Sequence, residues 1–296
     1  MNIVVIGHGM VGHKFLEQLH ALGVADANVT VLCEEPRAAY DRVHLSEFFS
    51  GKSAEDLSLV APGFFEASGF TLRLAARAAA VERRERTVTT ADGEVIPYDR
   101  LVLATGSAPF VPPVPGRDRP HCFVYRTIED LEAMQASAAR SRTGVVVGGG
   151  LLGLECAKAL RDLGLETHVV EFAPRLMAVQ VDDGGGRVLR SKIEDLGVQV
   201  HTGRNTLEIT DGATARHRMV FADGTHLETD MIVFSAGIRP RDEIARQCAL
   251  AIGPRGGVAV DDHCRTSDRN VYAIGECASW RCLLYTSDAA DDSLRV

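Results

Sequence analysis

Apolar residues in this chain follow two alternating patterns: short continuous runs and longer stretches with helical spacing. Residues 2–6 and 29–32 are short runs rich in β-branched side chains, which is typical of buried parallel strands. Between them, apolar residues recur at helical spacing over residues 10–22, and Gly23 follows where a helix commonly ends. The pattern therefore predicts a strand, a helix and a second strand near the N-terminus.

The same order of elements returns in the middle of the chain. Residues 144–147 form an apolar run, residues 151–163 have helical spacing and end before Gly164, and residues 167–170 form another run. A repeat of this size indicates two similar domains rather than a solenoid of short repeats. At 296 residues the chain is long enough for each domain to have its own core.

Each predicted helix is preceded by a G-x-G-x-x-G turn, at residues 7–12 and at residues 148–153. In such a turn the first glycine permits a tight bend, the second lets a pyrophosphate approach the backbone, and the third lets the helix pack on the strand. Each second strand is followed by an acid, Glu34 or Glu171, placed to bind a ribose hydroxyl. A turn that binds nothing is the alternative, but the complete units favour two dinucleotide sites, with a pyrophosphate at each helix N-terminus.

Two further apolar runs end in turns at which we expect the chain to pass from one domain to the other. Residues 101–104 are followed by Thr105 and Gly106, and then by prolines at 109, 112, 113 and 115. Prolines extend neither a sheet nor a helix, so this segment predicts a stiff crossover between the domains. Residues 231–240 repeat the pattern and are predicted to return the chain to the first domain. A simple strand-end turn is the alternative for residues 104–106.

A last apolar run, residues 271–274, ends in Gly275 and Glu276. A carboxylate at the end of a buried strand is placed to accept hydrogen bonds from a polyol, such as the ribityl chain of a flavin. On these residues alone, an ordinary strand end is at least as good an interpretation.

Composition narrows the class of protein. The chain is 46% hydrophobic and 24% charged, and its net charge of −8 has no basic stripe, so nucleic acid is not an expected partner. No apolar run approaches the roughly 18 residues that would span a bilayer, and no signal peptide is recognised, so we expect no membrane association. The seven cysteines are scattered without a C-x-x-C pair, which favours a reducing cytoplasm. The histidines, including His8 and His13 beside the first turn, lack metal-ligand spacing, and no metal is expected.

The order of these motifs resembles the pyridine nucleotide-disulfide oxidoreductase superfamily, from Met1 to about Arg281. The motifs are G-x-G-x-x-G, Ala-Thr-Gly, a second G-x-G-x-x-G, and T-x-x-x-x-x-Y-A-x-G-[DE] over residues 266–276. The resemblance implies an α/β fold with two Rossmann-like dinucleotide-binding domains, the second inserted in the first. It implies an FAD-binding domain at residues 1–115 and 242–281, and an NAD(P)H-binding domain at residues 116–241.

The superfamily resemblance also implies roles for residues. The first turn and Glu34 would hold the ADP half of FAD, the second turn and Glu171 would hold NAD(P)H, and Glu276 would hold the flavin ribityl chain and phosphate. Because Glu171 is a carboxylate, NADH is expected over NADPH, although the nearby Arg175 could soften this preference. Cys33 stands without the second cysteine of a redox pair, so direct dithiol chemistry is not expected.

A narrower resemblance is to the N-terminal flavin region of assimilatory NAD(P)H-nitrite reductase large subunits. It rests on "GHGMVGHKF", "YDRVHLSEFF", "GGGLLGLECAKAL" and "YAIGECASW". It implies an FAD-dependent oxidoreductase in which NAD(P)H delivers hydride to flavin and electrons pass onward. Siroheme and an iron–sulfur cluster would lie only in a missing downstream part. The alternatives are a ferredoxin- or rubredoxin-type reductase, an NADH oxidase, or a non-catalytic redox sensor. A homodimer is left open.

Related ferredoxin reductases often have lysine at the position of Glu47, so any flavin contact by Glu47 is left open. Arg42 and Ser46 are candidates for lining the flavin, with an exposed loop as the alternative. The cofactor carries the chemistry in such enzymes, so no catalytic residue is predicted. The predicted cofactor-binding residues are Gly7, Gly9, Met10, Val11, Gly12, Glu34, Glu35, Arg42, Ser46, Ala104, Thr105, Gly106, Gly148, Gly150, Leu151, Leu152, Gly153, Glu171, Ala236, Gly237, Gly275 and Glu276.

The last residues, 282–296, have neither strand nor helix periodicity and no motif. They resemble the translation of a sequencing-library adapter, so we expect a non-native tail and exclude it from the fold. An unrelated natural tail is the alternative.

Overall fold

The computed structural model describes residues 1–24 and 27–280. Within the described residues the chain divides into two compact units: the first holds residues 1–40, 58–107 and 240–280, and the second holds residues 41–57 and 108–239. The chain thus leaves the first unit and returns to it, as an inserted domain requires. The predicted tail, residues 282–296, lies outside the described residues.

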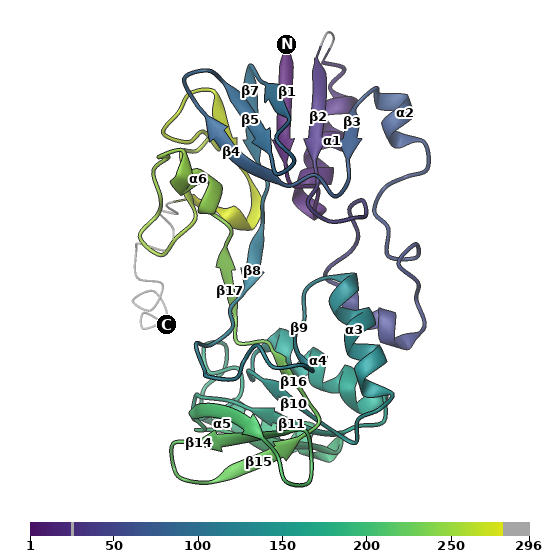
Figure 1. The fold of residues 1–296 in the computed structure, drawn as a ribbon, viewed down its shortest axis with the longest axis vertical. Helices are drawn as coiled ribbons and strands as arrows, with labels where there is room; N and C mark the ends of the chain where they lie inside the picture. Colours follow the sequence, from purple (N-terminus) through teal and green to yellow (C-terminus); the bar gives the residue numbers. More distant parts are fainter. Residues whose placement is uncertain (25–26, 281–296) are drawn as a thin grey trace, which may run out of the picture. The chain divides into compact units, whose positions relative to one another are not determined.

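A parallel five-stranded sheet forms the centre of the first unit, with strand order β19-β7-β1-β2-β3 (Figure 1). Its strands are β1 (Asn2–Ile6), β2 (Asn28–Leu32), β3 (Thr71–Arg73), β7 (Arg100–Leu103) and β19 (Val271–Ala273). Because side chains alternate along β1, Ile3 and Val5 pack in one apolar cluster with Leu16 of α1 (Met10–Ala21). Val4 and Ile6 pack in a second cluster on the other face of the sheet. The predicted strand–helix–strand unit is confirmed.

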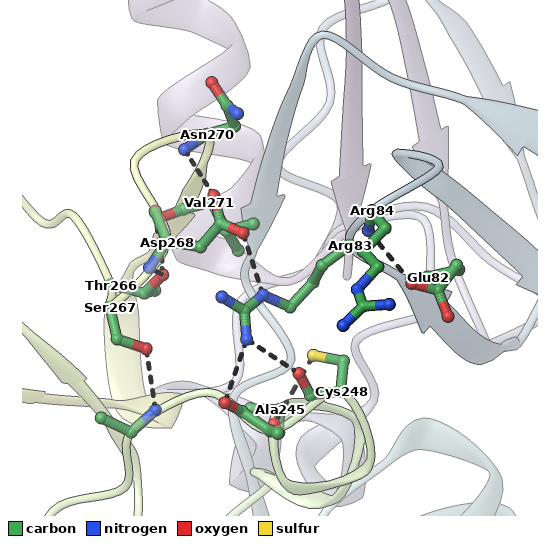
Figure 2. A network of polar contacts seen from close by, with 12 residues as sticks. Glu82, Arg83, Arg84, Ala245, Cys248, Thr266, Ser267, Asp268, Asn270 and Val271 are labelled. Atoms are coloured by element: carbon green, nitrogen blue, oxygen red, sulfur yellow. Dashed lines mark hydrogen bonds and ion pairs between the residues drawn. The ribbon is translucent and has the colours of Figure 1, made fainter.

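The remaining elements of the first unit are short. A small antiparallel sheet consists of β4 (Ala78–Glu82), β5 (Thr87–Thr90) and β6 (Val95–Pro97). The two short helices are α2 (Phe64–Ser68) and α6 (Glu243–Gln247), and the 3-10 helix is η2 (Gly275–Cys277). A pair of strands consists of β18 (Val258–Val260) and β20 (Ala278–Trp280). Figure 2 shows how this small sheet is attached to the returning segment. The Arg83 guanidinium donates to Asp268 at 2.9 Å and to the carbonyl oxygens of Cys248 at 3.2 Å and Ala249 at 3.1 Å. One side chain therefore joins segments that are distant in sequence.

The second unit has its own parallel sheet, with strand order β12-β11-β10-β16-β9. Its strands are β9 (Cys122–Val124), β10 (Thr143–Val147), β11 (Glu166–Val170), β12 (Val198–His201) and β16 (Met231–Phe234); its helices are η1 (Leu45–Ser50), α3 (Ile128–Ala138), α4 (Leu151–Asp162) and α5 (Asp183–Asp195). A three-stranded antiparallel sheet, β13 (Thr206–Asp211), β14 (His217–Phe221) and β15 (His226–Thr229), packs on the apolar face of β10 and β16. The predicted α/β class with two Rossmann-like domains is confirmed.

The observed boundaries differ from the predicted ones near the crossovers. The chain passes between the units in β8 (Ser107–Pro109) and β17 (Ile238–Pro240), so the second unit begins before residue 115. The proline-rich segment is not a free linker, because Val111 and Val114 pack against the core of the second unit. Among the described residues, no helix is both long and apolar enough to cross a membrane.

Candidate dinucleotide sites at the two glycine turns

The outer two glycines of the first turn are fixed by close packing. Gly7 has φ +105°, and a Cβ on it would lie 2.2 Å from the Ala104 carbonyl oxygen. A Cβ on Gly12 would lie 2.6 Å from the Gly7 carbonyl oxygen. Both contacts are far inside van der Waals distance, so any side chain at either position would displace the backbone. The roles predicted for these two glycines match the geometry.

Gly9, the middle glycine of the first turn, differs from the other two. A Cβ on it would meet nothing within 4 Å, so the turn has open space where the motif predicts a pyrophosphate. Gly9 is also the N-cap of α1 and makes no side-chain capping bond. The first backbone N–H groups of a helix lack partners within the helix and favour an anion. Met10 and Val11 form this first turn of α1, and Val11 is 45% exposed.

The second turn has the same arrangement. A Cβ on Gly148, whose φ is +122°, would lie 2.2 Å from the Ser235 carbonyl oxygen, and one on Gly153 would lie 2.0 Å from the Gly148 carbonyl oxygen. Gly150, the uncapped N-cap of α4, again has nothing within 4 Å. Leu151 and Leu152 at the start of α4 are exposed, and their contact with a ligand stays a prediction. Ala236 and Gly237 follow Ser235, so they lie beside this turn.

The two strand-end acids are held in different ways. Glu171 accepts hydrogen bonds from the backbone N–H groups of Gly149 and Ala173. These bonds tie the second glycine turn to the end of β11. Glu34 instead forms an ion pair with Arg241 and lies 3.7 Å from the Nε atom of Arg77. Sequence reasoning missed both arginines, because they lie far from Glu34 along the chain.

The Ala104–Gly106 motif positions the returning chain. The Thr105 hydroxyl donates to the Arg241 carbonyl oxygen at 2.6 Å, and the Arg241 N–H donates to the Gly106 carbonyl oxygen at 2.9 Å. Ala104 itself packs against Gly7. The motif is therefore more than a strand end, since it joins the first glycine turn to the segment that carries Arg241.

Glu276 has a partner that sequence reasoning also missed. The Ser107 hydroxyl donates to its carboxylate at 2.7 Å. Gly275 has φ +75°, and a Cβ on it would lie 3.2 Å from Val11 at the start of α1. Glu276, Ser107 and the open side of the first turn therefore lie on the same end of the first sheet. Glu276 and the first turn were predicted from sequence; for Ser107 the only available signal was its position directly after the Ala-Thr-Gly motif.

Arg42 and Ser46, predicted to lie in the first domain, belong to the second unit in the structure. The reason is that η1 packs against α3 and α4. Arg42 donates to the Arg126 carbonyl oxygen at 2.8 Å, and Ser46 lies close to the Tyr125 hydroxyl, whose pKa is raised by burial. Glu35 stays in the first unit, where it accepts a 2.8 Å hydrogen bond from the Tyr40 hydroxyl. A flavin contact by these residues stays a prediction.

Comparison with known proteins identifies a family whose model matches this chain, and several similar proteins. The model of the family "Pyridine nucleotide-disulphide oxidoreductase" matches residues 1–291. The chain is 56% identical to the nitrite reductase (NADH) large subunit of Escherichia coli K12, over 95% of this chain and 33% of that protein. It is 30% identical to the rubredoxin-NAD(+) reductase of Pseudomonas putida, over 96% of this chain and 74% of that protein. The structure of an NAD-dependent persulfide reductase from A. fulgidus has a TM-score of 0.90 at 28% identity, over 96% of this chain and 55% of that one.

Proposed function

Because this chain belongs to the pyridine nucleotide-disulphide oxidoreductase family, we propose that it is the flavin-reducing part of a nitrite reductase large subunit. The family implies FAD and NAD(P)H as cofactors, and makes the chain an oxidoreductase. The chain spans 33% of the length of the E. coli relative. The reduction of nitrite is therefore proposed for the longer protein of which this chain would be a part. In this proposal the longer protein is cytoplasmic, and its remaining part receives the electrons at siroheme and an iron–sulfur cluster.

The observation that carries the proposal is the pair of matched turns, each with two packed glycines around an open middle glycine. We assign FAD to the first turn because of what ends the neighbouring strands. In the first unit Ser107 and Glu276 offer a hydroxyl and a carboxylate, which are suitable partners for the polyol of a flavin dinucleotide. In the second unit β16 is followed by Ser235, Ala236 and Gly237, which offer no carboxylate.

The chemistry comes from the cofactor, which accepts hydride from NAD(P)H and passes electrons onward when bound. The chain's own residues bind and orient. The N-terminus of α1 and the backbone at Gly9 hold one pyrophosphate, and α4 with Gly150 holds the other. Glu34 and Glu171 receive the two adenosine riboses.

Glu171 makes NADH the preferred donor in this proposal. Two backbone N–H groups fix its carboxylate, which pairs with a ribose 2′-hydroxyl and repels a 2′-phosphate. Arg175 could have attracted a 2′-phosphate, but its guanidinium is occupied. It donates to Asp183 at 2.7 Å and to the carbonyl oxygens of Val181 at 2.9 Å and Ala178 at 3.1 Å. These contacts support NADH as the donor in this proposal.

A reductase for a small electron carrier is the second candidate, favoured by the match to rubredoxin-NAD(+) reductase over 74% of that protein. Both candidates require flavin, so the first experiment is to purify the chain with added FAD, remove free nucleotide, denature it and identify what is released. We expect FAD. Release of no flavin would overturn both candidates. Adding nitrite or oxidised rubredoxin to the full-length protein with NADH then separates them.

A further inference from the structure

His8 stands between the first two glycines of the first turn and is almost completely buried, at 4% exposure. Its Nδ1 atom accepts a 3.1 Å hydrogen bond from the backbone N–H of Ala39. Ala39 lies in the loop that follows Glu34 and is itself only 2% exposed. One side chain therefore connects the turn predicted to hold pyrophosphate with the loop that carries the ribose-binding acid.

The surroundings of His8 fix its ring and exclude water. Its ring makes edge contacts with the rings of His13, at 5.3 Å between centroids, and Phe65, at 5.5 Å. Nδ1 accepts a hydrogen bond, so in the neutral ring Nε2 carries the hydrogen, and within the described residues Nε2 has no hydrogen-bond partner. The Ala39 N–H cannot donate to water instead, because Ala39 is buried. Removal of the His8 acceptor would leave a buried donor unsatisfied.

The second turn makes the equivalent connection without a side chain of its own. Gly149 occupies the position that corresponds to His8, and a Cβ there would lie 2.6 Å from Leu176. The Gly149 N–H donates directly to Glu171, the strand-end acid. In both units a backbone bond ties the first glycine to the end of the second strand, from Gly7 to Leu32 and from Gly148 to Val170, and the next residue of the turn adds a bond to the chain that follows. In the first unit the acid is engaged by Arg241 and Arg77, and the imidazole supplies the link.

We propose that His8 is a positioning residue for the first dinucleotide site, whose neutral imidazole holds the loop of Glu34 against the glycine turn. The inference deepens the proposed function, since the ligand of that site is FAD. Protonation of Nδ1 would place an N–H against the Ala39 N–H and break the link.

Burial, and secondarily the neighbouring His13, lower the pKa of His8 from 6.5 to about 4. His13 is the titratable group that faces His8, and beyond it lie Glu17, whose oxygen is 3.8 Å from His13 Nε2, and Lys14. A histidine with a lowered pKa takes up its proton more readily when unfolded. Its contribution to stability is therefore complete above pH 6.5 and falls as the pH drops from 6.5 towards 4.

The test compares His8→Leu, which lacks an acceptor, with His8→Asn, whose amide oxygen can replace Nδ1 and does not titrate. The readouts are hydrogen exchange at the Ala39 amide and the dissociation constant of FAD. In His8→Leu we expect Ala39 to exchange at least about tenfold faster and FAD to bind about tenfold more weakly, as for a buried donor without an acceptor. His8→Asn should resemble the wild type. His20→Leu, at an exposed histidine of the helix that follows the turn, is the control and should change neither readout.

The pH profile separates positioning from simple packing. The free energy of unfolding of the wild type should fall more steeply than that of His8→Asn as the pH drops from 6.5 towards 4, and the wild type should lose Ala39 protection and FAD affinity near pH 4, where the imidazole of the folded protein takes up its proton. The inference is overturned if Ala39 exchange in His8→Leu equals that of the wild type, or if His8→Asn is as weak as His8→Leu. It is also overturned if the wild type and His8→Asn share one pH profile. If neither the wild type nor any variant binds FAD while Ala39 exchange still depends on His8, the FAD assignment fails and the positioning role stands.

Discussion

The two glycine turns have nearly the same backbone but differ in the groups that secure them. In each turn the outer glycines are pressed against carbonyl oxygens and the middle glycine faces open space. The second turn is secured by Glu171 through backbone N–H groups, while the first uses the His8 imidazole and leaves Glu34 with two arginines. The comparison teaches that glycines specify the shape of the turn, and that their neighbours specify how the strand-end acid is held. In the first unit, a ligand at the turn would have to compete with these arginines for Glu34.

The largest expected effect comes from the packed glycines. Gly7→Ala or Gly148→Ala should lower the free energy of unfolding by more than about 4 kcal/mol, since each adds a Cβ about 2.2 Å from a carbonyl oxygen. Gly9→Ala, where nothing lies within 4 Å, should cost at most about 1 kcal/mol as a helix N-cap change. Denaturant unfolding measures both. Equal losses for Gly7→Ala and Gly9→Ala would contradict the division of roles within the turn.

The next effect separates the two sites by ligand. Gly9→Val and Gly150→Val place the same side chain in the open space of each turn, where a pyrophosphate would lie. Gly9→Val should fold but retain no FAD. Gly150→Val should retain FAD that NADH no longer reduces. Retention of FAD by Gly9→Val together with its loss from Gly150→Val would reverse the assignment of the sites.

A smaller effect concerns the choice of nicotinamide cofactor. Glu171→Gln keeps an oxygen for the Gly149 N–H, gives up the bond from the Ala173 N–H, and removes the charge that repels a 2′-phosphate. The ratio of kcat/KM for NADH to that for NADPH should fall about tenfold, equivalent to roughly 1.4 kcal/mol. Glu166→Gln, an exposed acid at the other end of β11, is the control and should leave the ratio unchanged. A wild type that prefers NADPH would refute the role given to Glu171.

The smallest effect is expected at Arg241. Its ion pair with Glu34 is partly exposed, with side chains 38% and 42% accessible, so it is worth less than about 1 kcal/mol. Arg241→Gln should tighten FAD binding slightly, because Glu34 no longer leaves an ion pair to meet the ribose. Titration calorimetry at low and high salt checks this. A loss of affinity beyond about tenfold would instead assign Arg241 to direct contact with the ligand.

Local sequence was sufficient to predict the turns, helices and strand-end acids, because each depends on residues within one strand–helix–strand unit. The contacts that complete the sites were not predictable, since they join distant segments. Ser107 and Glu276 are 169 residues apart, and Arg241 and Glu34 are 207 residues apart. The placement of residues 41–57 was missed for a similar reason, because it follows from packing of η1 on α3 and α4. His8 was considered only as a metal ligand, since no local pattern indicates that its Nδ1 meets Ala39.

The central claim is that the first turn holds FAD and the second presents NADH to it. The most direct measurement is an anaerobic titration of the purified, FAD-loaded chain with NADH, followed through the visible absorption of the flavin. The account predicts that the flavin band bleaches with equimolar NADH and that NADPH is less effective. A chain that binds FAD but keeps the oxidised flavin spectrum with excess NADH would contradict it.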